Sequence, residues 1–229
     1  MTLERASEVD KFDRYARSYS QAHAASVRAS GEAPEYFARH KLACLARLGA
    51  TREQRVLDYG CGTGSLTRLL VEQFTSVSAY DPSALSLEQA RSVAPRACYH
   101  ESESAIPASA FELAVLSGVL HHVPPGERAQ LLQSVASKLC VGGRVIIFEH
   151  NPYNPLTVKA VRACPFDDDA VLLAPGEVRR LLRTRAFGSV RRDYVLFFPH
   201  LLRALRPLEP FLRRCPLGAQ TLTSGTRVA

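Results

Sequence analysis

A short apolar segment that ends in three closely spaced glycines constrains the fold more than any other part of the sequence. Residues 56–64 read Val-Leu-Asp-Tyr-Gly-Cys-Gly-Thr-Gly, and apolar residues with helical spacing follow from Leu66 to Phe74. Glycines in a strand-to-helix turn let the backbone approach a ligand closely and adopt angles that other residues resist. Such turns also serve packing and dinucleotide binding, but the GxGxG spacing differs from the GxGxxG of a Rossmann dinucleotide site. We therefore expect a ligand site at the carboxyl end of a buried strand.

Strands and helices alternate after this turn. Residues 77–81, 111–117 and 144–149 predict strands, and helices are expected after Pro82 and from Gly126 to Leu139. This alternation is typical of a parallel sheet that is covered by helices on both faces. The chain is therefore expected to be of the α/β class.

An acidic residue, Asp81, ends the strand that follows the glycine turn, about 20 residues further on. A carboxylate at this place can accept hydrogen bonds from both hydroxyls of a ribose, and it repels a 2′-phosphate. The alternative is a structural role as the N-cap of the helix that begins near Pro82. Both roles are compatible with the sequence.

Taken together, these residues resemble the class I S-adenosylmethionine-dependent methyltransferase family, in particular its small-molecule branch with the ubiquinone and menaquinone methyltransferases. The resemblance covers residues 12–149. It rests on 12–19 (Phe-Asp-Arg-Tyr-Ala-Arg-Ser-Tyr), the 58–64 turn, Asp81, and 119–124 (Val-Leu-His-His-Val-Pro). It implies a Rossmann-like, doubly wound, mostly parallel seven-stranded sheet with an antiparallel last strand, an N-terminal helical cap and inserted C-terminal lid segments.

The resemblance also implies a cofactor, S-adenosylmethionine, and a set of residues that bind it. The glycines would face its methionine part, Asp81 its ribose and Ser117 its sulfonium, while Tyr19 closes over it and Arg39 pairs with its carboxylate or lies at the surface. The family often has an Asp-Ala pair near the adenine; residues 101–107 depart from it, so that contact falls to Ser102 or Glu103. The expected cofactor-binding residues are Tyr19, Arg39, Asp58, Gly60, Cys61, Gly62, Gly64, Asp81, Pro82, Ser102 and Ser117.

The 229 residues, of which 46% are hydrophobic, suit a single domain. We expect a helical cap over residues 1–50, a cofactor-binding core over 51–149, and a substrate-side lid with the C-terminal strands over 150–229. In that last part, strands are expected at 190–198 and near 221–223, with a helix over 177–185. The long stretches 150–175 and 199–217 between these elements are predicted to be loops that recognise the substrate.

Four side chains near the ends of predicted strands are candidates for removing a proton from the methyl acceptor: His121, His122, Glu149 and His150. The carboxyl edge of a parallel sheet is where ligands bind, and a base is needed only if an alcohol, phenol or carbon acid is methylated. The structural alternatives are a turn packed beneath the pocket for the histidine pair, and a helix cap for Glu149. In small-molecule relatives, a histidine of the first pair and an acid at the second position commonly serve proton removal.

The acidic run 167–169 could join His121 and His122 as metal ligands. Its spacing matches no zinc or calcium motif, and we expect the run to cap a helix that starts near Ala170. No metal is therefore expected. Residues 151–155 (Asn-Pro-Tyr-Asn-Pro) are similar to the NPPY loop of amino-methylating nucleic-acid enzymes, but they follow the fifth strand rather than the fourth and are expected to form a rigid turn.

The positive charge is concentrated near the C-terminus. The net charge is +7, and residues 176–229 contain 11 basic and 3 acidic residues. Residues 199–214 alternate leucines with arginines around two prolines, which indicates either a cap on the domain or an arginine-rimmed hydrophobic lip for an apolar anionic acceptor, with peripheral membrane contact. The six cysteines include no CxxC pair and the chain begins with polar residues, so we expect reduced thiols and a cytoplasmic location.

The resulting hypothesis is a methyltransferase for a small-molecule or lipid-like acceptor, such as an isoprenoid or natural product. The alternatives are a nucleic-acid methyltransferase, which the basic tail favours, and a non-catalytic protein that binds the cofactor. A nucleic-acid substrate is disfavoured because no separate binding module is evident. The sequence indicates neither the acceptor nor the oligomeric state.

Overall fold

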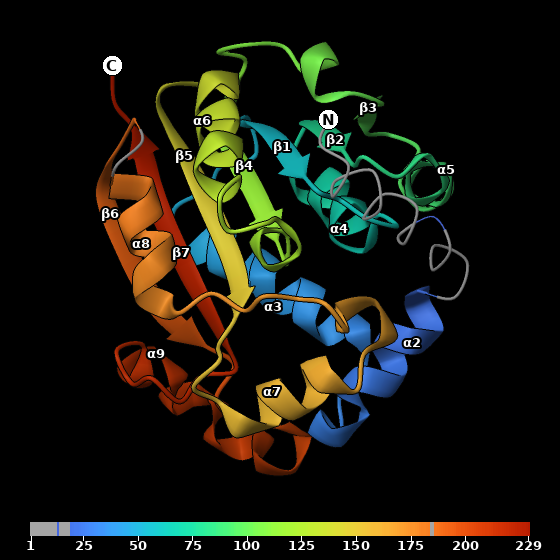
Figure 1. Ribbon diagram of the computed structural model, residues 1–229, viewed down its shortest axis with the longest axis vertical. Coiled ribbons are helices and arrows are strands. Elements are labelled where there is room, and N and C mark those ends of the chain that lie inside the picture. Colours follow the sequence, from blue (N-terminus) through green and yellow to red (C-terminus); the bar gives the residue numbers. More distant parts are fainter. Residues whose placement is uncertain (1–12, 14–18, 184–185) are drawn as a thin grey trace.

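The computed structural model describes Asp13, residues 19–183 and residues 186–229, with the backbone alone for residues 19–21. Within these ranges, seven strands form one sheet (Figure 1). The strands are β1 Arg55–Tyr59, β2 Ser76–Tyr80, β3 Cys98–His100, β4 Phe111–Ser117, β5 Leu139–His150, β6 Phe187–Val195 and β7 Gln220–Arg227. Their spatial order is β3-β2-β1-β4-β5-β7-β6.

The strand directions confirm the predicted mostly parallel sheet with an antiparallel last strand. Strands β1 to β5 pair in parallel, and β7 runs antiparallel to both of its neighbours, β5 and β6. The short strand β3 was not predicted. β5 begins earlier than residue 144, and β6 occupies 187–195 rather than 190–198.

Helices cover both faces of the sheet because its central strands are apolar on both sides. On β4, Ala114 and Leu116 belong to one buried cluster, and Leu113 and Val115 belong to another. The first cluster includes side chains of α6 (Arg128–Lys138) and α8 (Pro175–Arg183). The second includes side chains of α3 (Pro34–Arg47) and α4 (Ser65–Gln73). The remaining helix of the core, α5 (Ala84–Val93), follows β2.

A third group of elements lies beyond the end of β5 (Figure 1). It contains α2 (Tyr19–Val27) with the 3-10 turn η1 (Arg28–Ser30), α7 (Pro155–Arg162), the 3-10 segment η5 (His200–Leu208) and α9 (Glu209–Leu212). Three further 3-10 turns are η2 (Glu103–Ala105), η3 (Leu120–His122) and η4 (Pro165–Asp167).

The stretch 150–175 differs from its prediction as a loop. Asn154 accepts a hydrogen bond from the N–H of Thr157 and caps α7, whose first residue is Pro155, so the Asn-Pro segment starts a helix. The expected helix near Ala170 is absent from the described residues. The acidic run instead ends the 3-10 turn η4, and the chain is irregular until α8.

The C-terminal insertion rests on the N-terminal cap. Arg206 pairs with Glu32, and its guanidinium lies 4.3 Å from the centre of the Tyr36 ring. His200 also lies 3.1 Å from the Glu32 carboxylate. These contacts place 199–214 over the beginning of α3. Every helix in the described part of the chain is too short or too polar to cross a bilayer.

Candidate active site

A cavity of about 810 Å³ opens at the carboxyl ends of the central strands. Its volume is within the range of about 300–1,000 Å³ that is usual for small-molecule sites. Of the residues predicted for the site, those that line the cavity are Asp58, Gly60, Cys61, Gly62, Asp81, Pro82, Ser102, Ser117, His121, His122 and His150. Further lining residues come from α2, α3 and α7, so the cap and lid elements form its outer wall.

The three glycines of the turn have left-handed backbone angles, but they have different surroundings. Gly60, Gly62 and Gly64 have φ angles of 77°, 52° and 83°. A Cβ on Gly62 would meet no atom within 4 Å, whereas one on Gly64 would lie 2.9 Å from the Cα of Ala90. Gly64 does not line the cavity. It serves the close packing of α4 against α5, and its predicted contact with the cofactor stays a prediction.

Asp81 lies buried at the floor of the cavity. Its carboxylate accepts hydrogen bonds from the N–H of Gly62 at 2.8 Å and the N–H of Ser83 at 3.0 Å. Burial raises its pKa to about 6. The N-cap of α5 is Ser83, whose hydroxyl accepts from the N–H of Ser86, so the alternative helix-capping role does not belong to Asp81. The carboxylate instead fixes the glycine turn from the side of the second strand.

Asp58 is also buried, and burial raises its pKa to about 6. The hydroxyl of Thr67 donates to it at 2.7 Å. Asp58 therefore joins the end of β1 to the first turn of α4 and holds the glycine turn from its other side.

Arg39 does not line the cavity and lies at the surface, which is the second of its two expected roles. Its guanidinium is exposed and pairs with Glu35 at 2.8 Å. Lys41 lines the cavity instead, and burial lowers its pKa to about 8. This residue was missed, although a signal exists: Lys41 lies three residues from both Ala38 and Cys44, on the buried face of α3.

Tyr19 is the first residue of α2, but its side chain lies outside the described part of the structure. The same holds for most of the segment 12–19 that supports the family resemblance. His23, one turn further along α2, lines the cavity and was not predicted. Burial lowers its pKa to about 4.

Glu149 lies behind the cavity rather than in it. It is buried at the end of β5, and its carboxylate accepts hydrogen bonds from the N–H of Leu120 at 2.8 Å and the N–H of Val119 at 3.2 Å. Its other oxygen lies 2.6 Å from Nδ1 of His121. Glu149 is therefore in a position to orient His121, which lines the cavity.

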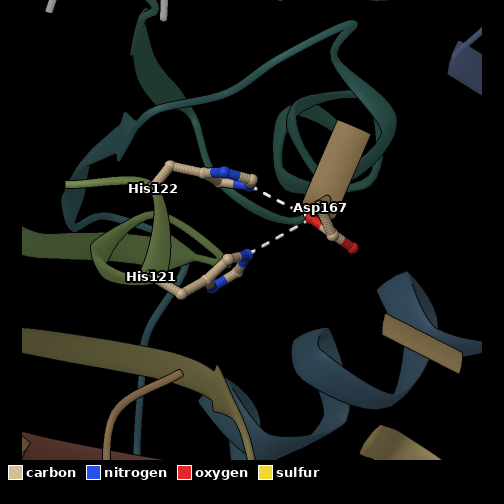
Figure 2. Close-up of side chains that lie close together, drawn as sticks. All are labelled: His121, His122 and Asp167. Carbon is tan, nitrogen blue, oxygen red and sulfur yellow. Dashed lines mark ion pairs between the residues drawn. The ribbon is translucent and has the colours of Figure 1, made fainter. Parts of the chain in front are cut away.

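The histidine pair faces an acidic residue from the acidic run. Nε2 of His121 lies 3.6 Å, and Nε2 of His122 3.3 Å, from Oδ1 of Asp167 (Figure 2). Burial opposes a charge on His121, but the carboxylates of Glu149 and Asp167 outweigh it and raise the pKa of His121 to about 9. Burial lowers the pKa of His150, whose ring centre lies 5.0 Å from that of His121, to about 3.

Backbone contacts hold the two parts of this cluster together. The N–H of Val171 donates to the carbonyl of His121 at 2.9 Å. Arg128 on α6 is buried and donates to the carbonyls of Leu120 and Val123 at 3.0 Å and of Val171 at 2.7 Å. It therefore joins the histidine turn to the segment that follows Asp167.

Known methyltransferases match this chain in sequence. A family model described as a methyltransferase domain matches residues 30–186. An uncharacterized methyltransferase of Staphylococcus carnosus is 32% identical over 123 residues, which cover 50% of this chain and 58% of that protein. A trans-aconitate 2-methyltransferase of Mycobacterium ulcerans is 30% identical over 157 residues, which cover 60% of this chain and 57% of that protein. The chain thus spans less than three fifths of the length of these curated relatives.

The fold is similar to that of solved methyltransferases as well. One from Thermotoga maritima, described as S-adenosylmethionine-dependent and as a possible histamine N-methyltransferase, superposes with a TM-score of 0.67 at 19% identity. The match covers 96% of this chain and 99% of that one. At this identity the likeness shows a shared fold, whereas the family model spans well over half of the sequence. The chain therefore belongs to the methyltransferase-domain family of class I S-adenosylmethionine-dependent methyltransferases.

Proposed function

We propose that this chain transfers the methyl group of S-adenosylmethionine to a small-molecule acceptor. The observation that carries this proposal is that one cavity contains both Asp81 beside Gly62 and the histidine cluster around His121. A cofactor at the glycine turn would therefore have its reactive end in the same enclosed space as groups that can bind an acceptor and take a proton. Because the chain spans only part of its curated relatives, their substrates are starting points for tests.

The cofactor is proposed to lie across the carboxyl ends of β1, β2 and β4. Gly60 and Gly62 offer close backbone approach to its methionine part, and the Asp81 carboxylate accepts its ribose hydroxyls. Ser117 lies at the end of β4, near the sulfonium, and Ser102 lines the adenine end beside Glu103. Lys41, rather than Arg39, is the lining cation that can pair with the cofactor carboxylate.

Methyl transfer is proposed to be a direct displacement. A lone pair of the acceptor forms the new bond to the methyl carbon, the carbon–sulfur bond breaks, and its electron pair stays on sulfur to give S-adenosylhomocysteine. Holding the two reactants in line accounts for much of the acceleration. If the acceptor is a hydroxyl or carbon acid, its proton leaves to a neighbouring base. His121, His122 and His150 line the cavity for this role, and Glu149 orients His121.

A panel of acceptors tests the proposal. Small carboxylic acids such as trans-aconitate, phenols and isoprenoid alcohols are incubated with the enzyme and S-adenosylmethionine, and release of S-adenosylhomocysteine is measured by mass spectrometry. We expect one small-molecule class to be methylated. Cofactor binding without turnover on any class would favour the non-catalytic alternative, and salt-dependent retention on RNA or DNA would favour a nucleic-acid substrate.

A lipid-like acceptor, with peripheral membrane contact, is proposed for the segment 199–214. Leu201 and Phe211 in this segment have exposed fractions of 92% and 85%, and Arg203, Arg213 and Arg214 lie beside them in the sequence. Exposed apolar side chains together with arginines suit the interface of an anionic bilayer. The segment contacts the cap through the Arg206–Glu32 pair, and its first residue, Pro199, lines the cavity.

Vesicle flotation tests this contact. We expect the wild type to float with phosphatidylglycerol-containing vesicles, and the Leu201→Asp, Phe211→Asp double variant to lose at least about ten-fold in partitioning because two apolar anchors are removed. Val141→Asp is the control, since Val141 is also an apolar residue, is 65% exposed, and lies near the start of β5. A wild type that stays in the vesicle-free fraction would rule the contact out.

A further inference from the structure

Two imidazoles and one carboxylate converge in the cavity wall. The ligand atoms of His121, His122 and Asp167 all lie within 4.8 Å of one another. Figure 2 shows both rings pointing toward the same carboxylate oxygen. The two histidines come from the turn η3, and Asp167 ends the turn η4. All three line the cavity, so the cluster is open to the space proposed for the acceptor.

Among the described residues, one buried carboxylate oxygen of Asp167 faces the two histidines without a hydrogen bond of good geometry. The residue is only 7% exposed, and its Oδ1 has no hydrogen bond of acceptable geometry within the described part of the chain. A buried carboxylate oxygen without such partners is costly. The nearby imidazole nitrogens face it at 3.3 and 3.6 Å, so a cation between the three groups would satisfy all of them at once.

The distances between the ligand atoms of the three residues fit the coordination sphere of a zinc ion. Zinc–nitrogen and zinc–oxygen bonds of about 2.0–2.2 Å in a tetrahedral site place two ligand atoms about 3.4 Å apart. The two distances to Asp167, 3.3 and 3.6 Å, fall on either side of this value. The distance between the two imidazole ligand atoms is at most 4.8 Å. Small ring rotations would therefore close the site around an ion.

The contact of His121 through its other ring nitrogen, Nδ1, is also typical of a metal-binding histidine. A histidine that binds a metal through one ring nitrogen almost always donates the other N–H to a carboxylate or carbonyl. Nδ1 of His121 lies 2.6 Å from Glu149, and that carboxylate is itself held by the N–H of Leu120. With a proton kept on Nδ1 by Glu149, a metal ion would replace the proton on Nε2, the nitrogen that faces Asp167.

We propose that His121, His122 and Asp167 bind a divalent transition-metal ion of the zinc class. Two imidazoles and one carboxylate suit Zn²⁺, Co²⁺ or Fe²⁺ better than Mg²⁺ or Ca²⁺, which prefer oxygen ligands. Three protein ligands leave an open position toward the cavity, where the ion would act as a Lewis acid on an acceptor oxygen. This inference rests on the proposed function and refines it: His121 and His122 become ligands, and His150 remains beside them to take a proton.

The spacing of the three residues in the sequence matches no linear metal motif, and no metal was expected for that reason. The two segments meet only through the fold, by way of the Val171–His121 hydrogen bond and the buried Arg128. Adjacent histidines can serve one ion here because their rings lie side by side, with centres 4.2 Å apart, above the same carboxylate.

Metal binding is measured directly on the tag-free full chain. The protein is stripped with a chelator and dialysed against Zn²⁺, and bound metal is determined by elemental mass spectrometry. Co²⁺ is bound in parallel and followed by its visible absorption. We expect one ion per chain, and at least about ten-fold weaker binding in Asp167→Asn and in His122→Gln. Glu149→Gln should also weaken binding, by about 10–100-fold, because Glu149 orients His121.

Two controls make the outcome decisive. His100→Gln changes a histidine of β3 that does not line the cavity, and it should bind Zn²⁺ like the wild type. Zinc held by cysteines would persist in Asp167→Asn, so equal binding by that variant and the wild type overturns the proposal. S-adenosylhomocysteine is titrated into the same samples. A wild type that binds it but no Zn²⁺ or Co²⁺ overturns the metal site alone, whereas metal binding without S-adenosylhomocysteine binding contradicts the proposed function.

Discussion

Asp81→Asn is expected to weaken the binding of S-adenosylhomocysteine about 100-fold, because the carboxylate can make two charged hydrogen bonds to the ribose and each is worth about 1.5–3 kcal/mol. The substitution keeps the shape of the side chain. It leaves one acceptor oxygen for the N–H of Gly62 and the N–H of Ser83, which now bind separate carboxylate oxygens, and for the ribose of the proposed complex. Calorimetric titration measures the affinity, and circular dichroism shows whether the variant stays folded.

Asp193→Asn is the matched control, since Asp193 lies on β6 and does not line the cavity. It should bind S-adenosylhomocysteine as the wild type does. If the folded Asp81→Asn variant also bound like the wild type, the ribose would have to lie elsewhere, and the proposed orientation of the cofactor would be wrong.

The pH dependence of S-adenosylhomocysteine binding gives an independent check on Asp81. Burial, with a smaller contribution from Asp13, raises the pKa of Asp81 to about 6. The charged form that accepts two hydroxyls is present above this pH and is lost as the pH falls through it. Wild-type affinity should therefore drop about ten-fold by about pH 5. Asp58, whose pKa is also raised to about 6, titrates in the same range, so a flat profile in Asp81→Asn is needed to assign the effect to Asp81.

The side of the cavity that the glycine turn and Asp81 line was predictable because its signals are local. The glycine turn and Asp81 each follow a short apolar strand, and parallel strands bring their carboxyl ends to one edge. The same rule brought His121 and His122 to the site. It does not show that Gly64 lies outside the cavity, because a left-handed glycine that packs against Ala90 has the same sequence appearance as one that lines a site.

Lys41, the cation that lines the cavity among the described residues, shows how a periodic signal can be overlooked. Arg39 matched the family expectation, but with Glu35 it lies on the exposed face of α3. Lys41 shares the buried face with Ala38 and Cys44, and a charged residue at such a position indicates a functional site or an internal partner. Helical spacing alone would have selected Lys41.

The position of Asp167 in the site could not be predicted from helical spacing or from strand ends. Its neighbours in the sequence are also acidic, and a run of aspartates before an apolar segment is typical of a helix N-terminus. Its partners, His121 and His122, lie far away in the chain, and nothing in the spacing records that they meet. Hydrogen bonds from Arg128, a residue of the predicted helix 126–139, join the two segments.

Arg128→Met is expected to destabilise the protein by about 3 kcal/mol, because removing one partner of a buried ion pair costs about 3–5 kcal/mol and the pair's other member here is partly solvated. Arg128 is 1% exposed, and its guanidinium donates to three carbonyls and pairs with Glu177 at 2.8 Å. Methionine fills much of the same volume but leaves the carbonyls without donors. The melting temperature, followed by circular dichroism, should fall by roughly 10 °C, at about 2–4 °C per kcal/mol for a chain of this size.

Two matched variants separate the parts of this effect. Glu177→Gln removes the ion pair but keeps the three carbonyl bonds, and because the Glu177 side chain is 26% exposed, we expect a loss below about 1 kcal/mol. Arg128→Lys keeps the charge but lacks the forked donors, so its stability should lie between those of the wild type and Arg128→Met. An Arg128→Met protein that melts with the wild type would show that the carbonyls find other donors.

Arg128→Met also distinguishes the two halves of the cavity, the glycine-turn side and the histidine side. Neither the glycine turn nor Asp81 contacts Arg128 among the described hydrogen bonds, so folded Arg128→Met should still bind S-adenosylhomocysteine. The histidine turn and the segment after Asp167, in contrast, lose the side chain that joins them. Zinc binding and acceptor methylation should therefore fall together while cofactor affinity stays. If all three fell equally below the melting transition, the two halves would form one cooperative unit, and the buried arginine would support the whole cavity rather than its acceptor side.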